Sequence, residues 1–190
     1  MKCILITSTA FLLLFLATAP VFAQGAGIEW EIFNQEVQEL FYTGNIDRAI
    51  VIAKKALNVA VKNVGPDHPD VTTSLSNLAL LYHTQCRYAL AEPLLKRSLA
   101  IQEKALGPDH PDMVTGLNNL AMLYETQGEY ALAEPLYKRA LGIKEKTLGL
   151  DHPDVATSLL HLAAMYRALQ QNEEADTLTQ RAARIRGKRR

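Results

Sequence analysis

The chain has little cysteine, with only Cys3 and Cys86 among its 190 residues. Two cysteines cannot form the disulfide framework that holds many small secreted domains together. The sequence also lacks every common catalytic motif: it has no G-x-S-x-G elbow, H-E-x-x-H pair, Walker loop or C-x-x-C. Formal net charge is zero, because 20 basic side chains balance 20 acidic ones. The sequence therefore predicts no enzyme.

Long apolar runs are absent except at the front of the chain. Lys2 precedes an apolar stretch at 4–16, and Val21-Phe22-Ala23 ends the segment with a small-x-Ala pattern before Gln24. This order is typical of a secretory signal cleaved after residue 23. It predicts export to a periplasmic or extracellular location. The alternative is an uncleaved N-terminal anchor, because the apolar part of 1–23 is about as long as one membrane span.

A repeated segment dominates the rest of the sequence. Gly-Pro-Asp-His-Pro-Asp at 65–70 returns at 107–112, and again at 149–154 with Leu150 in place of proline. The spacing is 42 residues both times (107 − 65 and 149 − 107), and 29 of 42 positions are identical between 65–106 and 107–148. A fixed period of this length indicates stacked supersecondary units.

Each repeat has the periodicity of two helices. Leu75, Leu78, Ala79 and Tyr82 step along one helical face, and a second apolar run begins at Tyr88 after a short break. A single hairpin of this kind exposes its apolar face, so only stacking on neighbouring hairpins can bury it. The pattern predicts an all-α solenoid without a catalytic pocket.

Steps of 42 residues place small side chains in three columns and large ones in two. Small columns indicate positions where helices approach closely. They are Val37/Ala79/Ala121/Ala163, Ala49/Ala91/Ala133/Ala175 and Ala56/Ser98/Ala140/Ala182; the large columns are Phe33/Leu75/Leu117/Leu159 and Leu40/Tyr82/Tyr124/Tyr166. Gly44, Cys86, Gly128 and Gln170 share the turn between the two helices. We expect Cys86 to be a half-buried structural residue there; the alternatives are a redox site and an intermolecular disulfide.

The pattern Leu117-x2-Leu120-Ala121-x2-Tyr124, followed by Ala133-x3-Tyr137, resembles the tetratricopeptide repeat. With its 42-residue length and the stretch 134–141, it is similar to the repeats of kinesin light chain. The resemblance implies a right-handed α-solenoid of four helical hairpins over residues 24–186, with a basic tail at 187–190. Its repeats would span about 24–64, 65–106, 107–148 and 149–186. Glu36, Asn172 and Thr179 depart from the pattern, as expected of terminal repeats that face water.

The three Asp-His-Pro-Asp motifs raise a metal site as one interpretation. Equivalent positions in successive hairpins would lie about two helix spacings of 8–10 Å apart, too far for one coordination sphere. Helix starts explain the motif better, with each proline (Pro69, Pro111, Pro153) in the first helical position. The aspartates Asp70, Asp112 and Asp154 would then lie in the first turn, and Asp67 or His68 could cap it. We expect no metal and no cofactor.

The resemblance also implies a binding face. In tetratricopeptide proteins the first helices line the concave side, where an asparagine holds the backbone of an extended peptide. Asn77 and Asn119 match that position, whereas Gln35 and His161 depart from it. The neighbouring columns would supply selectivity: Ser76, Asn118, Leu80, Met122, His83, Glu125 and Arg167. The alternative is that these asparagines merely solvate an exposed helix face.

Charge is unevenly distributed along the chain. Residues 24–176 carry 13 basic and 20 acidic side chains, whereas 177–190 carry six basic and none acidic. The tail could contact anionic lipid weakly or simply be a solubilising end; nucleic acid is not expected of an exported protein. The leading hypothesis is an exported protein-interaction module, adaptor or scaffold that binds a protein or peptide segment. The alternatives are a self-associating solenoid (a homo-oligomer) and a membrane-anchored scaffold.

Overall fold

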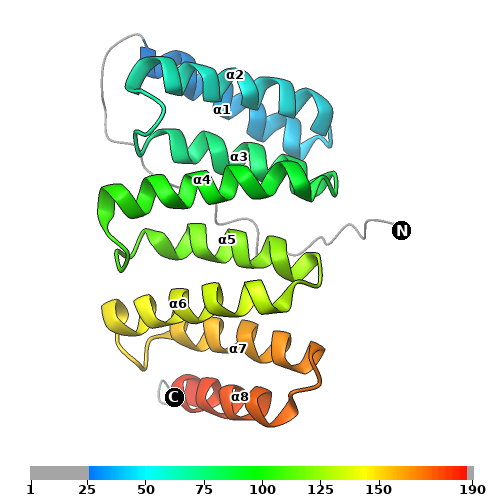
Figure 1. Ribbon diagram of the computed structural model, residues 1–190, viewed down its shortest axis with the longest axis vertical. Helices are drawn as coiled ribbons and strands as arrows, with labels where there is room; N and C mark the ends of the chain where they lie inside the picture. Colours follow the sequence, from blue (N-terminus) through cyan, green and yellow to red (C-terminus); the bar gives the residue numbers. More distant parts are fainter. Residues whose placement is uncertain (1–25, 188–190) are drawn as a thin grey trace. The chain divides into compact units, whose positions relative to one another are not determined.

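The computed structural model describes residues 26–187, which form eight α-helices and no strand (Figure 1). The all-α prediction is therefore confirmed for this part of the chain. The signal segment expected at 1–23 lies outside the described residues. In chain order the helices are α1 (Ala26–Tyr42), α2 (Ile46–Val64), α3 (Val71–Thr84), α4 (Tyr88–Leu106), α5 (Met113–Thr126), α6 (Tyr130–Leu148), α7 (Pro153–Ala168) and α8 (Asn172–Gly187).

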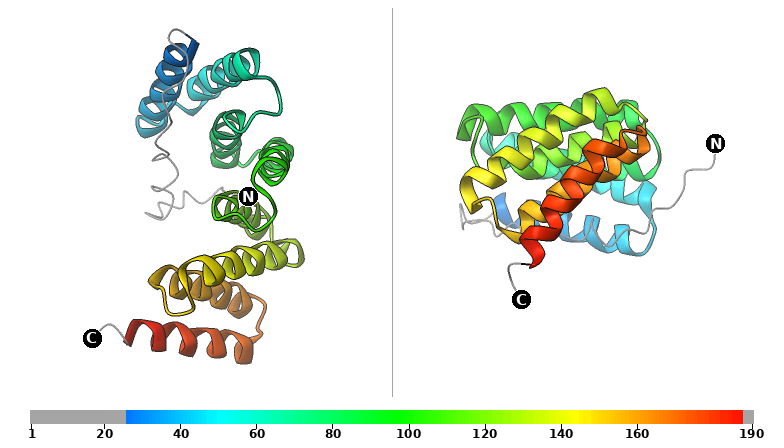
Figure 2. Two further views of the ribbon diagram at one scale, coloured as in Figure 1. Left: turned by 90° about the vertical axis from the view of Figure 1, so that its left-hand side faces the viewer. Right: turned by 90° about the horizontal axis from the view of Figure 1, so that it is seen from below.

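The described residues divide into two compact units, and the boundary falls inside α4. The N-terminal unit is 26–101 and contains α1, α2, α3 and most of α4. Its core includes Ala60, Val71, Leu75 and Ile101, and Trp30 packs against this cluster. α1 packs along α2, and α2 packs against α3 (Figure 2).

The C-terminal unit is 102–187 and contains the end of α4 followed by α5 to α8. Its consecutive helices pack on one another, α5 on α6, α6 on α7 and α7 on α8 (Figure 2). Met113, Leu117, Leu159, Leu162 and Met165 are almost completely buried. Each of these side chains comes from the first helix of a pair, so these helices supply much of the core.

The columns found in the sequence are the close contacts of both units. All twelve residues of the three small columns are at most 2% exposed. Large-column residues are also buried, apart from half-buried Phe33. A side chain as large as leucine at one of the alanine positions would have to displace a neighbouring helix, because protein interiors are close-packed. The 42-residue pattern is therefore a packing pattern.

The turn inside each hairpin has the same backbone geometry in all four repeats. Gly44, Cys86, Gly128 and Gln170 all have positive φ, at 77°, 57°, 78° and 61°. A residue in the left-handed conformation just after a helix lets the chain reverse direction while the carbonyls of the last helical turn still accept hydrogen bonds. Glycine adopts this conformation without strain, whereas Cys86 and Gln170 do so at a cost. Cys86 is half-buried, as expected from the sequence.

The helix starts differ from the prediction in two of three connectors. Pro153 opens α7, as expected, but α3 and α5 begin two residues after their prolines, at Val71 and Met113. There, backbone hydrogen bonds to the carbonyl three residues earlier replace the first α-helical turn. The Val71 N–H donates to the His68 carbonyl and the Met113 N–H to the His110 carbonyl, both at 3.0 Å. The expectation for Pro69 and Pro111 was therefore wrong.

A histidine side chain caps the chain at all three connectors. Nδ1 of His68, His110 and His152 accepts the backbone N–H two residues later, at 3.2, 3.3 and 3.2 Å. This bond satisfies one of the N–H groups that a helix start leaves without a partner. The Asp-His-Pro-Asp motif is therefore a structural motif.

Candidate protein-binding face

The residues predicted to bind a ligand lie on the first helix of each pair. We call their position the first-helix face and describe it separately in each unit. In the N-terminal unit it comprises Gln35 on α1 and Ser76, Asn77, Leu80 and His83 on α3. In the C-terminal unit its members come from α5 and α7: Asn118, Asn119, Met122, Glu125, His161 and Arg167.

In the N-terminal unit part of this face is buried by contacts between α1 and α3. Asn77 is only 4% exposed, and its Nδ2 donates to Oδ1 of Asn34 on α1 at 3.0 Å. Next to this pair, the Trp30 indole N–H donates to Ser74 Oγ at 2.7 Å. Leu80 is 9% exposed. Asn77 is therefore a buried, hydrogen-bonded residue, which corrects the alternative that it solvates an exposed face.

The remaining members of the N-terminal face are more accessible. Gln35 is exposed and donates to Glu39 at 3.5 Å, and half-buried Ser76 lies 3.3 Å from the Ser98 hydroxyl. His83 is half-buried with its ring 5.4 Å from that of Tyr88. Burial lowers the pKa of His83 below its usual range, because the surroundings disfavour the charged ring.

In the C-terminal unit the equivalent face is accessible. Asn118, Asn119, Met122 and Glu125 are half-buried, and His161 and Arg167 are exposed. The side chain of Asn119 makes no hydrogen bond with another described residue. Its amide group keeps both donor and acceptor capacity, as an extended peptide backbone would need.

Two members of the C-terminal face are held by neighbouring side chains. Glu125 accepts the hydroxyl of Tyr137 on α6 at 2.7 Å, and burial together with this carboxylate raises the pKa of Tyr137. Arg167 donates to Thr179 at 3.1 Å and lies 3.4 Å from Asp176. Both contacts orient a charged group that stays open to solvent, so they restrict its rotamers without covering it.

Sequence reasoning missed Lys144, a second-helix residue beside this face. It is half-buried on α6, and its Nζ donates to Ser158 Oγ on α7 at 2.9 Å. Burial lowers the pKa of Lys144. The pKa of His161 is also lowered, first by burial and then by the positive charge of Lys144, whereas the negative charge of Glu125 acts in the opposite direction. The signal was the column Ala60, Gln102, Lys144, in which a small residue becomes a long polar one.

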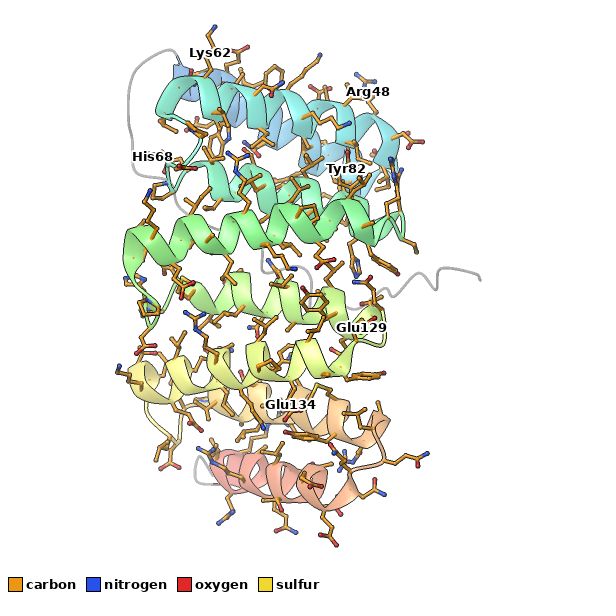
Figure 3. The ribbon with its side chains drawn as sticks, in the orientation of Figure 1. Arg48, Lys62, His68, Tyr82, Glu129 and Glu134 are labelled. Carbon is orange, nitrogen blue, oxygen red and sulfur yellow. The ribbon has the colours of Figure 1, made fainter. Side chains whose placement is uncertain are left out.

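A polar network joins α6 to α7 in the same unit. Glu134, which is labelled in Figure 3, accepts the Tyr166 hydroxyl at 2.6 Å and pairs with Lys138 at 2.6 Å. Hydrogen bonds from Lys138 and Tyr166 lower the pKa of the Glu134 carboxyl, so it is charged at neutral pH. Within this network the Tyr166–Glu134 hydrogen bond joins α7 to α6, and the Lys138–Glu134 pair lies within α6.

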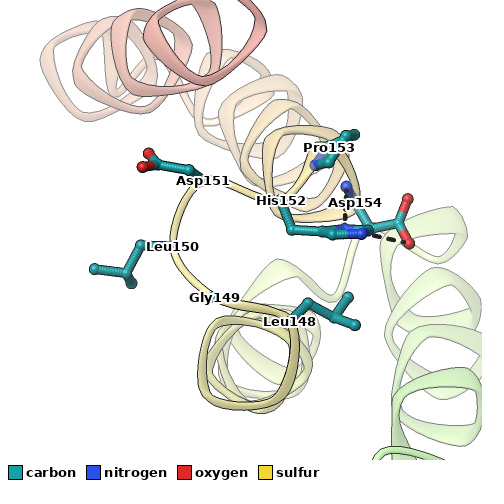
Figure 4. Close-up of a pocket in the computed structure, with 7 residues that line it drawn as sticks. All are labelled: Leu148, Gly149, Leu150, Asp151, His152, Pro153 and Asp154. Carbon is teal, nitrogen blue, oxygen red and sulfur yellow. Dashed lines mark hydrogen bonds and ion pairs between the residues drawn. The ribbon is translucent and has the colours of Figure 1, made fainter. Parts of the chain in front are cut away.

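The connector after α6 encloses a depression of about 660 Å³ (Figure 4). Its seven lining residues, 148–154, are this connector together with the last residue of α6 and the first two of α7. His152 turns back onto Asp154, 3.8 Å from its carboxylate. Within 26–187, no group of three or more His, Cys, Asp or Glu side chains is placed to hold a metal ion. The depression is therefore the surface of one continuous stretch of chain, and no residue from a distant part of the described chain lines it.

None of the helices in 26–187 combines the length and apolarity that crossing a membrane requires.

Comparison with known proteins agrees with this architecture. The profile of the family described as Tetratricopeptide repeat matches residues 40–104, 71–146 and 112–188. No curated protein matches the chain. Among solved structures, BtubC (BKLC) from P. vanneervenii is 23% identical with a TM-score of 0.77, over 88% of this chain and 66% of that one. The chain thus spans slightly less than two thirds of that relative.

Two further structures are similar. A Podosopora anserina protein, named for kinesin light chain and its nearly identical TPR-like repeats, is 26% identical with a TM-score of 0.73, over 88% of this chain and 78% of that one. MamA is 16% identical with a TM-score of 0.60, over 84% and 80% of the two chains. Members of this family commonly act as protein-interaction modules and scaffolds. The chain belongs to the tetratricopeptide repeat family, with repeats like those of kinesin light chain.

Proposed function

We propose that the protein is exported and works as a protein-interaction module, holding a segment of a partner protein against its first-helix face. The observation that carries this proposal is the accessible polar face of α5 and α7. There Asn119 keeps its hydrogen-bonding groups, and His161 and Arg167 on α7 are exposed. A ligand that covers these groups without pairing them would lose about 1–3 kcal/mol per group, so the face favours a partner with exposed backbone amides.

Self-association through the chain's first helix is a weaker alternative. Two 42-residue columns are buried and apolar on the first helices of the later repeats, α3, α5 and α7. They are Leu78/Leu120/Leu162 and Leu81/Leu123/Met165. On α1 the same positions are Glu36 and Glu39, and Glu36 pairs with Arg48 at 3.4 Å. Packing another copy there would bury carboxylates, which is costly. A peptide ligand on the C-terminal unit requires no such burial.

Site-specific crosslinking tests the proposal. A photoreactive amino acid replaces Asn119 or His161 in the native host, and a third variant carries it at exposed Gly142 on α6 as the matched control. We expect a crosslinked partner at the first two positions and none at the third. Equal crosslinking at all three would contradict a defined face. A product with twice the mass of the chain would instead support self-association.

The export part of the proposal has a separate test. Cleavage after residue 23 would leave Gln24 at the N-terminus, so the intact mass of protein recovered from the native host should match 24–190. A mass that retains 1–23 would favour the anchor. Recovery of the protein in the cytosolic fraction would contradict export in either form.

A further inference from the structure

The C-terminal unit contains a half-buried positive charge without a partner of opposite charge. Lys144 lies on α6, and its Nζ donates to Ser158 Oγ on α7 at 2.9 Å. Within residues 26–187 this is the one hydrogen bond of the ammonium group, and no carboxylate forms an ion pair with it. Burial lowers the pKa of Lys144, because the group loses water without gaining a counter-ion. A charge in this state favours a ligand that brings a carboxylate to it.

Two carboxylates act on this part of the face, and neither pairs with Lys144. Asp154 is exposed with its carboxylate 3.8 Å from Nδ1 of His152, and only its longer-range field raises the pKa of Lys144. Glu125 of α5 acts on His161 and already accepts a hydroxyl group from α6. The charge of Lys144 also reaches His161, where it lowers the pKa of the ring. The uncompensated charge therefore acts on the first-helix face itself.

Ser158 holds the ammonium group of Lys144 in place. The Ser158 hydroxyl donates to the Asp154 carbonyl at 3.1 Å, so its oxygen is turned to accept from Lys144. An ammonium group has three N–H donors, and this contact uses one of them. The other two are left for a ligand. A donor that is already held in position loses less side-chain entropy on binding than one that rotates freely.

The repeats before this one lack a charge at the same position. The 42-residue column is Ala60, Gln102 and Lys144. Gln102, in the same unit, is half-buried and its Oε1 has no hydrogen-bond partner. A neutral amide pairs with donors and acceptors of any segment, whereas an ammonium group pairs best with an anion. Lys144 is therefore the member of this column that distinguishes ligands by charge.

We propose that Lys144 is a specificity-determining residue, which pairs with the carboxylate of an Asp or Glu side chain in the bound segment. The inference rests on the function proposed above, because it requires a segment on the first-helix face of α5 and α7. The backbone contact proposed for that segment is Asn119 on α5, whereas Lys144 belongs to α6. The two contacts thus require a backbone group and a separate carboxylate, which a side chain supplies while the segment continues along the face.

A peptide array tests this with the whole chain, in whichever N-terminal form its native host yields. The probes are peptides of varied sequence and about ten residues, which span about 33 Å when extended. They are blocked at both ends and come in pairs that differ only by Glu or Gln at one position. A third form of each has Gln there and a free C-terminal carboxylate. Among the peptides that bind, we expect the Glu form to bind roughly tenfold more tightly than either other form.

Three variants identify the residue that reads the charge. Lys144→Met keeps a long side chain at the half-buried position and should reduce the preference for Glu to less than about twofold, whereas Lys144→Arg should retain most of it. Lys146→Met is the matched control, because it removes the same charge from the same helix. Exposed Lys146 pairs with Asp109 at 3.0 Å, and its loss should leave the preference unchanged.

A second readout needs no ligand. The pKa of His161, measured by NMR titration of the free protein, should rise in Lys144→Met, because the positive charge that lowers it is gone. It should stay the same in Lys146→Met. An unchanged pKa of His161 in Lys144→Met would show that the charge does not reach the face, and would overturn the proposal.

The array has its own contrary outcomes. Equal binding of Glu and Gln forms, equal loss of preference in the two methionine variants, or failure of every Glu peptide to bind would overturn the proposal. Tightest binding by the free-terminus form would assign Lys144 to a chain end and overturn it as well. Crosslinking of the native partner at Asn119 would persist in each case, which separates these outcomes from failure of the proposed function.

Discussion

α3 and α5 are near copies of one sequence, yet their ligand-binding positions differ. Asn77 is buried and donates to Asn34, whereas Asn119 is half-buried and makes no hydrogen bond with another described residue. The difference comes from the preceding helix in the N-terminal unit, because α1 supplies Trp30 and Asn34 against α3. A repeat fixes the direction of a side chain, and its neighbours decide whether that side chain is available.

The largest expected loss of stability should be the same in α3 and α5, because both helices have the same close contact at one small column. Ala79→Leu and Ala121→Leu should each lower the free energy of unfolding by about 1–3 kcal/mol, because both sites are at most 1% exposed at a close helix contact. Urea denaturation followed by circular dichroism measures this. A surface control on α5, Thr115→Leu, should change little. An unchanged midpoint in either alanine variant would show that its column is not a contact.

The turns extend the comparison from α5 to α7. Gly128 and Gln170 both adopt positive φ, and no atom within 4 Å would obstruct a Cβ at Gly128. Gln170→Gly should therefore stabilise the protein by about 1 kcal/mol and Gly128→Ala should destabilise it by a similar amount, because only backbone strain changes. Thermal unfolding measures both. Shifts of the same sign would rule out backbone strain as the cause.

A smaller effect should come from a hydroxyl that α3 and α7 have and α5 lacks. Ser74 accepts from Trp30, and Ser158 accepts from Lys144. The equivalent residue on α5 is Gly116, and the residue equivalent to Lys144 is Gln102, whose Oε1 is buried without a hydrogen-bond partner. Gly116→Ser should stabilise the protein by about 0.5–1.5 kcal/mol, by pairing that oxygen and improving helix propensity.

Gly116→Ala is the matched control for this prediction. It improves helix propensity without adding a donor, so a gain equal to that of serine would show that Gln102 is not involved. Denaturant midpoints of the two variants, measured in parallel with the unsubstituted chain, give the difference directly.

These comparisons show which features the sequence could predict. The three small columns and the position of the turn inside each hairpin follow from spacing alone, because they depend on contacts that every repeat makes in the same way. Burial of Asn77 does not follow, since it depends on Asn34, whose equivalents are Ser76, Asn118 and Leu160. The delayed starts of α3 and α5 were missed because Pro69 and Pro111 look the same in sequence as Pro153. Lys144 was missed because second helices were not expected to reach the first-helix face.

The most direct test compares Asn77→Leu with Asn119→Leu in the whole chain, by urea denaturation. Trp30 fluorescence reports the N-terminal unit, since this is the chain's single tryptophan and it packs on that unit's core; circular dichroism reports all helices. We predict that Asn77→Leu lowers stability by about 1–3 kcal/mol, because Asn34 loses its buried partner. Asn119→Leu should stay within about 0.5 kcal/mol of the unsubstituted chain. Equal shifts in the two variants would contradict the claim that one asparagine serves the fold and the other is available to a partner.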